Sequence, residues 1–263
     1  MIVERLWPDN AYRNFHYLIA CAETGDALAV DPLDHVLCAR VARERGFTIT
    51  QILNTHEHLD HTGGNEGLRA VTGARVLAHA GAAVKIGRVD RGLARGDVIR
   101  IGRSVELECL DTPGHTMAHV CLFAHADEPA LFCGDTLFNA GAGNCHNGGS
   151  AEKLYETFVE QLARLPMETR IYPGHEYLNR NLAFTLDREP GNSDAARMAA
   201  ETARLPAQAA PVTTLADEFR INTFFRLSSQ GIIAGLRTKF PDLPAVPDPR
   251  TVFVRLRELR NGW

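Results

Sequence analysis

The chain has 263 residues, of which 45% are hydrophobic and 23% charged, a balance typical of a globular protein with one large domain or one domain plus a smaller one. Its net charge of −4 argues against a general attraction to nucleic acid, and no run of about 18 apolar residues indicates a membrane span. The N-terminus lacks the features of a secretory signal, and the six cysteines include no Cys-x-x-Cys pair. We therefore expect a reducing, cytoplasmic setting without a disulfide scaffold.

The first part of the chain alternates short apolar runs with turns, which predicts an α/β layered domain. Residues 14–21 and 27–32 are separated by AETGD and predict a β-hairpin. Residues 34–45 have helical apolar spacing, with Gly46 as the expected stop. Further strands are expected at 49–55, 74–79, 97–101, 104–112, 119–125, 130–135 and 169–175, and further helices at 64–72 and 151–165.

After about residue 176 the strand-like runs fade and helical segments dominate. Asp248 is a good N-cap and Pro249 a good first residue for a last helix, along which Val252, Leu256 and Leu259 form an apolar stripe. Residues 176–263 contain 12 basic and 10 acidic residues, so this part is mildly basic while the remainder carries −6. A basic helical appendage beside an acidic α/β domain suggests that it meets an anionic small substrate.

The strongest chemical signal is THEHLDH at residues 55–61, with four metal-ligand side chains in six residues. Alternation along an extended backbone puts His56 and His58 on the same side. Asp60 and His61 follow where the chain turns into a helix, so they point elsewhere, which suits two neighbouring metal ions better than one. The spacing differs from the helical His-Glu-x-x-His motif, so Glu57 is not expected to act as its general base.

Three further candidate ligands, His115, Asp135 and His175, each follow an apolar run with a glycine directly before them. Loops at strand ends are free to aim side chains into a site. The seven nitrogen and oxygen donors suit two divalent ions, with zinc as the first choice and iron or manganese as alternatives. A single histidine after a strand is usually structural or exposed, but a solvated loop rarely holds four such donors together.

The other histidines lack this context, and His16, His35, His79 and His125 are expected to be structural or exposed. His119 fits a partner of the metal ligands and a purely structural role equally well. Cys145 and His146, in AGAGNCHNGG, resemble a nucleophile with its base. Neighbouring side chains on an extended segment point apart, however, and chemistry at metal ions needs no thiolate.

These motifs resemble the metallo-β-lactamase superfamily, through His-x-His-x-Asp-His, His115 in TPGHT, Asp135 in GDT and His175 in PGHEY. The resemblance implies an α/β fold, a four-layer αββα sandwich with a dinuclear metal site at one edge of the sheets. Within it, the chain is similar to the glyoxalase II (hydroxyacylglutathione hydrolase) family, which also matches VDP, GDTLF, PGHEYLNRNLAF and EPGN. A catalytic domain is then expected over 1–175 and a helical substrate-binding domain over 176–263.

The resemblance also assigns roles to residues. It implies that His56, His58 and His115 hold a first metal and that Asp60, His61 and His175 hold a second. Asp135 would bridge the two with a water or hydroxide, and the catalytic set would be Asp135, His56, His58 and Asp60. Tyr177, Arg257 and Arg260 would hold glutathione, the two arginines being three residues apart on one helix face. Without the resemblance, they would be interpreted as a solvated basic face.

The segment after GDTLF departs from the family. Asn144 stands where a basic residue is expected, Cys145 and His146 replace two aromatic residues, and Asn147 replaces an acid. The metal motifs are intact, but half of the expected glutathione contacts differ. We therefore expect Asn144 and His146 to bind the substrate and to set its specificity.

The expected reaction is hydrolysis of a thioester, S-D-lactoylglutathione to D-lactate and glutathione or a related thiol ester. A thiolate leaving group with a pKa of about 8.5 needs little protonation, so no dedicated general acid is required. The alternatives are a lactonase or β-lactamase of the same fold, a mononuclear iron persulfide dioxygenase and a non-catalytic metal-binding protein. The helical C-terminal part argues against the first two, and the seven donors argue against the third.

Overall fold

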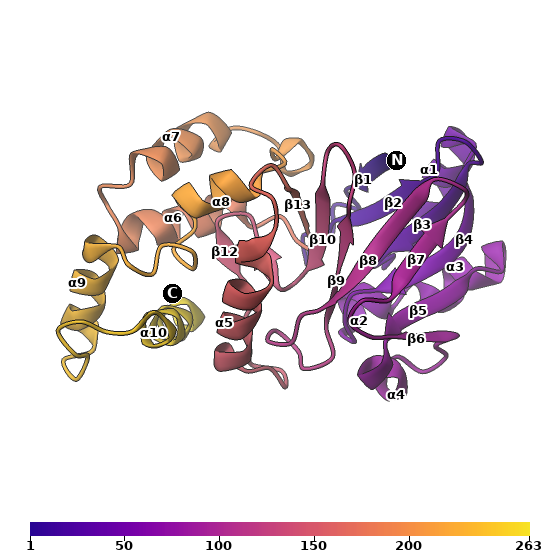
Figure 1. Cartoon of the computed structure of the whole chain (residues 1–263). Coiled ribbons are helices and arrows are strands. Elements are labelled where there is room, and N and C mark those ends of the chain that lie inside the picture. The colour runs from indigo at the N-terminus through magenta and orange to yellow at the C-terminus, as the bar shows by residue number, and fades with distance from the viewer.

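The computed structural model describes residues 1–263, and two β-sheets form its central layers (Figure 1). The six-stranded first sheet has the strand order β1 (Ile2–Leu6), β2 (His16–Ala20), β3 (Asp26–Val30), β4 (Thr48–Asn54), β5 (Arg75–His79) and β6 (Arg91–Leu93). The five-stranded second sheet has the order β13 (Arg170–Pro173), β10 (Ala130–Gly134), β9 (Val120–Ala124), β8 (Val105–Asp111) and β7 (Val98–Ile101). A short pair, β11 (Leu137–Phe138) and β12 (Gly141–Ala142), follows β10.

The pairing directions bring several strand ends to one edge. The predicted hairpin is confirmed, since β2 and β3 pair antiparallel. Strands β3, β4, β5 and β6 run parallel to one another, and β13 runs parallel to β10 in the second sheet. The carboxyl ends of parallel neighbours meet at the same edge of a sheet, so the loops that follow β3 and β4 lie together, as do those that follow β10 and β13.

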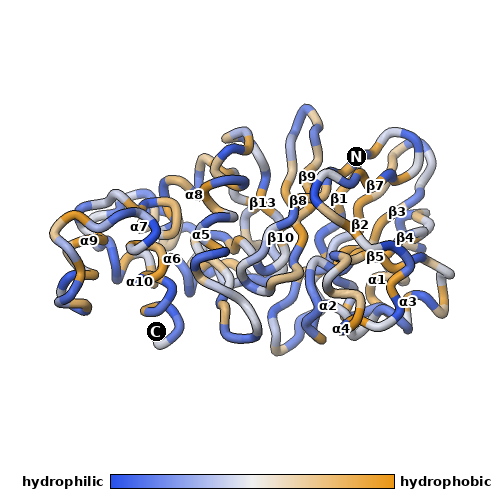
Figure 2. The backbone as a smooth tube through the Cα atoms, turned by 60° about the horizontal axis from the view of Figure 1, so that its bottom comes forward, coloured by the Kyte–Doolittle hydropathy of each residue, from blue (hydrophilic) through white to orange (hydrophobic).

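The largest apolar cluster lies between the two sheets and combines residues from both of them. Strand β2 is buried along its whole length because its two faces contact different layers. Tyr17 and Ile19 belong to the cluster between the sheets, whereas Leu18 packs with Cys38 on the outer side of the first sheet. A strand covered on both faces has a continuous apolar sequence rather than an alternating one. Figure 2 shows mostly hydrophobic stretches on the strands and hydrophilic loops at the periphery.

Helices cover both outer faces, which confirms the expected four-layer α/β sandwich. On the first sheet, α1 (His35–Arg45) and α3 (Asn65–Thr72) bury Ala42 and Leu68 against the strands. On the second sheet, α5 (Ala151–Glu160) buries Leu154 and Phe158 in a cluster shared with the C-terminal helices. Two single-turn helices, α2 (Leu59–Thr62) and α4 (Ala83–Ile86), lie in loops of the first sheet.

Some helix ends lie where the sequence predicts them, and others do not. The Asp34 carboxylate accepts a hydrogen bond of 2.9 Å from Leu37 N at the start of α1, and Gly46 ends the helix at φ 71°. The helix predicted over 151–165 is shorter, since α5 ends at Glu160 and a single 3₁₀ turn follows at Leu162–Arg164. Leu165 precedes a proline and is extended, as the proline ring requires, so the helical segment stops there.

The chain after residue 176 is helical, as predicted. Its helices are α6 (Leu178–Arg188), α7 (Ser193–Thr202), α8 (Leu215–Ile221), α9 (Gln230–Lys239) and α10 (Pro249–Asn261), with a 3₁₀ turn at Ala207–Ala209. One further 3₁₀ turn, Ala80–Ala82, lies in the connection between β5 and α4. Asp248 caps α10 by accepting a hydrogen bond of 3.0 Å from Thr251 N. Val252 and Leu256 bury the predicted stripe against α5, so this helix joins the C-terminal part to the second sheet.

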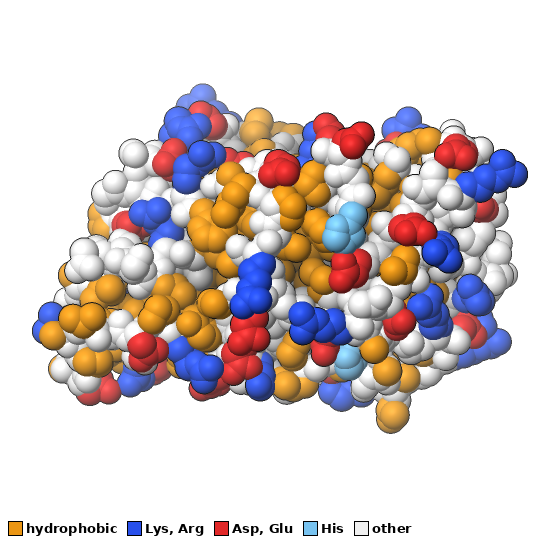
Figure 3. All heavy atoms as spheres, in the orientation of Figure 1, with side chains coloured by type: hydrophobic (Ala, Val, Ile, Leu, Met, Phe, Trp, Pro, Cys, Tyr) orange, Lys and Arg blue, Asp and Glu red, His pale blue; other side chains and the backbone are white.

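No helix in the structure combines the length and the hydrophobicity needed to cross a membrane. On the face shown in Figure 3, lysine and arginine side chains are interspersed with aspartate and glutamate. Hydrophobic side chains lie between them, several of them over the C-terminal helices. No single-sign patch dominates this face.

Candidate metal centre and adjoining pocket

Three histidine nitrogens from two distant segments meet at one point. The extended segment after β4 carries His56 and His58, whose Nε2 and Nδ1 atoms lie 2.9 Å apart. His115, between β8 and β9, places its Nε2 atom 3.1 Å from Nδ1 of His58. The alternation of an extended backbone accounts for the approach of the first two, and the closeness of β4 to the β8–β9 loop adds the third. Together they form a group whose ligand atoms lie within 4.8 Å of one another.

A second group lies beside the first. The single turn of α2 carries Asp60 and His61, and the loop after β13 carries His175. The Nε2 atoms of His61 and His175 are 3.2 Å apart, and Oδ2 of Asp60 is 3.5 Å from each of them. Two clusters of three donors therefore form from side chains of three separate segments: residues 56–61, the connection between β8 and β9, and the loop after β13.

Asp135, directly after β10, lies between the two groups. Its Oδ2 atom is 3.2 Å from Nε2 of His175 and 3.5 Å from Nε2 of His115, one residue from each group. Its Oδ1 atom is 3.5 Å from Nε2 of His61. The side chain is buried, so its charge acts at short range on both groups.

The donor set fits divalent metal ions. Nε2 of His58 and Oδ1 of Asp135 are buried polar atoms without a hydrogen-bond partner. A neutral imidazole carries a single N–H, so nitrogens that converge at about 3 Å cannot all satisfy one another by hydrogen bonding. A cation at the point of convergence satisfies them together. This nitrogen and carboxylate chemistry suits zinc, iron and manganese alike.

The second nitrogen of two histidines fixes how each ring presents its donor atom. Nδ1 of His115 lies 2.6 Å from the main-chain oxygen of Asn144, and Nδ1 of His175 lies 2.8 Å from that of Tyr12. A carbonyl oxygen only accepts hydrogen bonds, so in each ring Nδ1 carries the proton. The Nε2 lone pairs therefore face the cluster, as metal binding requires.

Burial and neighbouring charges set the protonation of these groups. Burial lowers the pKa of His56 far below its ordinary value and also lowers the pKa of His115, which keeps both rings neutral. Burial alone would lower the pKa of His61 too, but Asp135 and Asp31 outweigh it and raise this pKa to about 9. In the metal-free site one proton thus partly offsets the buried carboxylates, and a bound cation would displace it.

Two side chains behind the ligands hold them in place. Asp31, after β3, accepts hydrogen bonds from Thr55 N at 2.8 Å and from Nδ1 of His61 at 2.9 Å. His119 is fully buried, and its Nε2 atom accepts a hydrogen bond of 3.2 Å from the main-chain N–H of Asp135. The structure therefore places His119 as a partner of a candidate ligand, one of the two roles that its sequence context allowed.

A pocket of about 220 Å³ adjoins the second group and collects all five residues expected to contact substrate. Its lining consists of Phe138, Ala142, Asn144, His146, Tyr177, Arg180, Asn181, Arg257, Arg260 and Asn261. The Tyr177 ring stacks on the His175 ring with centroids 5.1 Å apart, which connects the pocket to the metal-ligand cluster. Arg180 and Asn181 are lining residues that sequence reasoning missed.

Arg257 is buried rather than part of a solvated basic face. Its Nη1 atom donates hydrogen bonds to the main-chain oxygens of Ala142 and Gly143, at 2.7 and 3.0 Å. Arg260, half-buried one turn later, donates to Oδ1 of Asn181 at 3.2 Å. Arg257 thus holds the loop that borders the pocket, while Arg260 faces the pocket with most of its N–H groups free.

Comparisons with known proteins extend these observations. Residues 16–175 match the metallo-beta-lactamase superfamily, and residues 176–263 match the hydroxyacylglutathione hydrolase C-terminus. The chain is 63% identical over 264 residues to a hydroxyacylglutathione hydrolase of a Polaromonas species and 62% identical over 263 residues to one of Nitrosococcus oceani, with 100% of both chains covered in each case.

The chain belongs to the hydroxyacylglutathione hydrolase family. This confirms the resemblance inferred from its metal motifs and C-terminal part. In three dimensions the chain is similar to ETHE1 of Myxococcus xanthus, with a TM-score of 0.69, 26% identity and coverage of 99% of this chain and 98% of the other. The fold and the family therefore agree with what the sequence implies.

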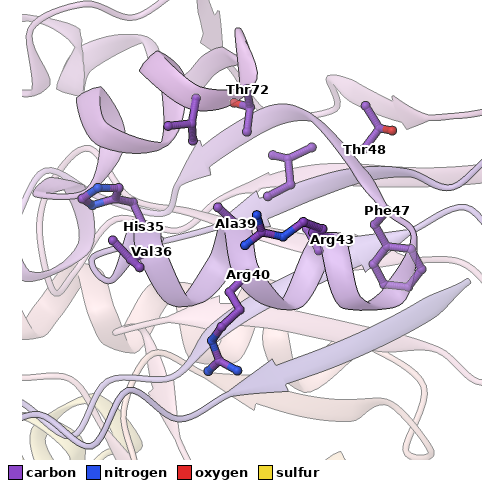
Figure 4. A pocket seen from close by; sticks show the side chains of 11 residues that line it. His35, Val36, Ala39, Arg40, Arg43, Phe47, Thr48 and Thr72 are labelled. Atoms are coloured by element: carbon purple, nitrogen blue, oxygen red, sulfur yellow. The ribbon is translucent and has the colours of Figure 1, made fainter.

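A larger hollow of about 600 Å³ lies away from the metal-ligand cluster (Figure 4). It opens between α1 and α3, where His35, Ala39, Phe47 and Thr72 are among its lining residues. None of the seven candidate ligands borders it. In this member of the hydroxyacylglutathione hydrolase family, the small polar pocket beside the cluster is therefore the better candidate for substrate binding.

The C-terminal helices hold the loop that leads from Asp135 to the pocket. Glu218 of α8 is fully buried and accepts hydrogen bonds from Ala140 N at 2.9 Å and from the Thr213 hydroxyl at 2.7 Å. Asn222, at the end of α8, donates to the main-chain oxygen of Gly141 at 3.0 Å. Burial raises the pKa of Glu218 to about 7, although its hydrogen bonds act in the opposite direction.

This raised pKa predicts a pH-dependent stability. Because the folded pKa lies above the ordinary value of 4.5, Glu218 stabilises the fold fully below pH 4.5, and this contribution is lost as pH rises through 7. The loss amounts to about 3 kcal/mol, since one pKa unit corresponds to about 1.4 kcal/mol. Glu218→Gln should remove this term, so its free energy of unfolding should rise relative to wild type between pH 5 and pH 8 in urea titrations. Parallel pH profiles for the two proteins would contradict the assignment.

Proposed function

We propose that this chain hydrolyses a thioester of glutathione, S-D-lactoylglutathione or a closely related one, to a hydroxy acid and free glutathione. The observation that carries the proposal is a cluster of seven histidine and aspartate donors beside an arginine-lined pocket, connected to it by the Tyr177 ring that stacks on His175. Relatives with 62–63% identity over the whole chain are hydroxyacylglutathione hydrolases, which supports the same reaction class. The match of residues 176–263 to that family favours it over the lactonase and persulfide dioxygenase alternatives.

The proposal includes two divalent metal ions per chain, zinc first and iron or manganese as alternatives. His56, His58 and His115 would hold one ion, Asp60, His61 and His175 the other, and Asp135 would contact both. Ions bound there supply an activated water nucleophile at neutral pH and polarise the carbonyl group that it attacks.

The side chains around the cluster then have defined tasks. Asp31 and His119 keep His61 and Asp135 in position through the hydrogen bonds described above. Tyr177 forms the wall between the cluster and the pocket, so a thioester carbonyl can lie at the cluster while the thiol carrier extends past this ring. A thiol with a pKa of about 8.5 leaves readily as a thiolate, so the absence of a nearby general acid does not hinder the reaction.

We also propose a division of labour along the chain. Residues 1–175 would act as the catalytic domain, because all seven candidate ligands lie in them. Residues 176–263 would act as the substrate-binding domain, because they contribute Tyr177, Arg257 and Arg260 to the pocket. Asn144 and His146 complete the pocket from the catalytic side.

The decisive experiment compares the same lactoyl group on different thiols. Purified protein with a measured metal content is assayed with S-D-lactoylglutathione and with lactoyl thioesters of coenzyme A and N-acetylcysteamine, by loss of the thioester absorbance. We expect kcat/KM to be at least about tenfold higher for the glutathione ester, a preference worth about 1.4 kcal/mol. The absence of any rate above background with the glutathione ester would refute the proposed substrate.

A further inference from the structure

Positive charge gathers in the pocket without an aspartate or glutamate side chain to balance it. Three of its lining residues are arginines, Arg180, Arg257 and Arg260, and none of the ten lining residues is an aspartate or glutamate. None of the three guanidinium groups forms an ion pair with an aspartate or glutamate side chain. Such pairs are formed elsewhere in the chain by Arg13, Arg45, Arg69, Arg226 and Arg255. Like charges gathered in a partly buried site cost free energy unless a ligand brings the opposite charge.

The three arginines differ in how much of their hydrogen-bonding capacity remains free. Arg257 is committed to the main-chain oxygens of the 142–143 loop. Arg180 uses one nitrogen on an oxygen of Trp263, the last residue of the sequence, at 3.2 Å, and Arg260 uses one nitrogen on Asn181. A guanidinium has five N–H donors, so Arg180 and Arg260 both retain donors for a ligand.

Arg180 and Arg260 act on the same small volume from different helices. Both side chains line the pocket, where burial and then the positive charge of Arg180 lower the pKa of Arg260. Arg180 lies three residues after Tyr177 in the first turn of α6, so the two side chains project from the same face. One helical turn thus places an aromatic ring against the metal-ligand cluster and a cation further along the pocket.

We propose that Arg180 determines substrate specificity by binding a carboxylate of the thiol carrier together with Arg260. This proposal rests on the proposed function, because glutathione carries two carboxylates, one at each end, and its sulfur must lie at the cluster. Paired guanidinium groups match a carboxylate through parallel charge-assisted hydrogen bonds. With Asn144 in place of a cation on the other side of the pocket, Arg180 supplies positive charge that residues 144–146 lack.

The position of Arg180 allows a clean test, because its side chain is exposed and forms no ion pair with an aspartate or glutamate side chain. Arg180→Ala should raise KM for S-D-lactoylglutathione about tenfold with kcat nearly unchanged, since charge-assisted hydrogen bonds to a ligand are of this strength. Arg180→Lys keeps the positive charge but not the planar, two-pronged guanidinium group, so its KM should lie between those of wild type and Arg180→Ala. Arg237→Ala is the matched control, because it removes an exposed positive charge from α9 outside the pocket.

Substrates with one carboxylate blocked identify the contact. Two substrates are compared: lactoylglutathione amidated at the glycine carboxylate, and lactoylglutathione blocked at the glutamyl carboxylate. For one of the two, the KM of wild type should be about tenfold higher than for the free substrate. For that substrate Arg180→Ala should cause no further loss. If Arg180→Ala raised KM equally for free and both blocked substrates, or left KM unchanged for the free one, the proposal would be wrong.

Calorimetric binding of free glutathione separates this proposal from the proposed function. A tenfold weaker Kd in Arg180→Ala than in wild type supports the carboxylate contact even if no thioester is turned over. If wild type hydrolyses S-D-lactoylglutathione but Arg180→Ala has the same Kd and KM as wild type, the role of Arg180 is refuted while the proposed function stands. No detectable binding of glutathione to wild type would also refute it.

Discussion

Replacing Asp135 with alanine is expected to lower kcat/KM for thioester hydrolysis at least about 1000-fold while the fold persists. The carboxylate contacts both groups of candidate ligands and is the only acidic side chain that does so. Its removal takes away the carboxylate that lies beside Nε2 of His61, His115 and His175, so metal affinity should fall as well. The carboxylate accepts no hydrogen bond from the backbone, so the fold should tolerate its loss.

The measurement combines three readouts on the same preparation: the hydrolysis rate, metal per chain by atomic emission, and the circular dichroism spectrum. Asp127→Ala is the control, because Asp127 is an exposed acid in the turn between β9 and β10. Asp135→Asn keeps the size of the side chain without its charge and should lose nearly as much activity. Near wild-type turnover in Asp135→Ala at full metal content would contradict a role for this carboxylate between two ions.

Gly64→Ala is expected to lower the free energy of unfolding by about 3 kcal/mol or more. A Cβ atom at this position would lie 1.8 Å from the main-chain oxygen of Pro32 and 2.6 Å from that of Leu33, which is far inside contact distance. Both clashes are with backbone, which cannot rotate away as a side chain can, so one of two loops must move. One of these loops carries Asp31, which holds His61, and metal affinity should therefore fall together with stability.

Urea unfolding of the metal-loaded protein measures this effect, with Gly191→Ala as the matched control. A Cβ at Gly191 meets nothing within 4 Å, so that variant should stay within about 0.5 kcal/mol of wild type. Equal stabilities for the two variants would show that the two loops separate without cost. That result would remove the structural reason for glycine at position 64.

Much of the candidate site could be inferred from sequence because its donors follow recognisable strands. The apolar runs before His56, Asp135 and His175 are buried strands. Parallel pairing brings the ends of β10 and β13 together, and the packing of the two sheets brings the end of β4 beside them. Family motifs then connected residues that lie more than 100 positions apart. Asp31 was not assigned a role, because one aspartate after a strand gives no local signal of a contact with His61, 30 residues later.

Other features depend on contacts that sequence patterns do not reveal. Strand β1 was missed because Ile2–Leu6 is a half-exposed edge strand with a mixed pattern of charged and apolar residues. Arg257 resembled a solvated residue or a ligand-binding residue, yet its guanidinium holds carbonyl groups 115 and 114 positions away. The convergence of Arg180 with Arg260 likewise depends on how α6 packs beside α10.

The segment from Asn139 to Gly143 is held from outside by side chains of three helices: Asn181 of α6, Glu218 and Asn222 at α8, and Arg257 of α10. The polypeptide that leads from Asp135 into the pocket pairs with itself only in the short β11–β12 hairpin, so these helices also determine its path. Transplanting this segment into a homologue with different helices would transfer the residues that set specificity but not the backbone path that positions them. In engineering, and in descent, the loop and its three helices have to change as one unit.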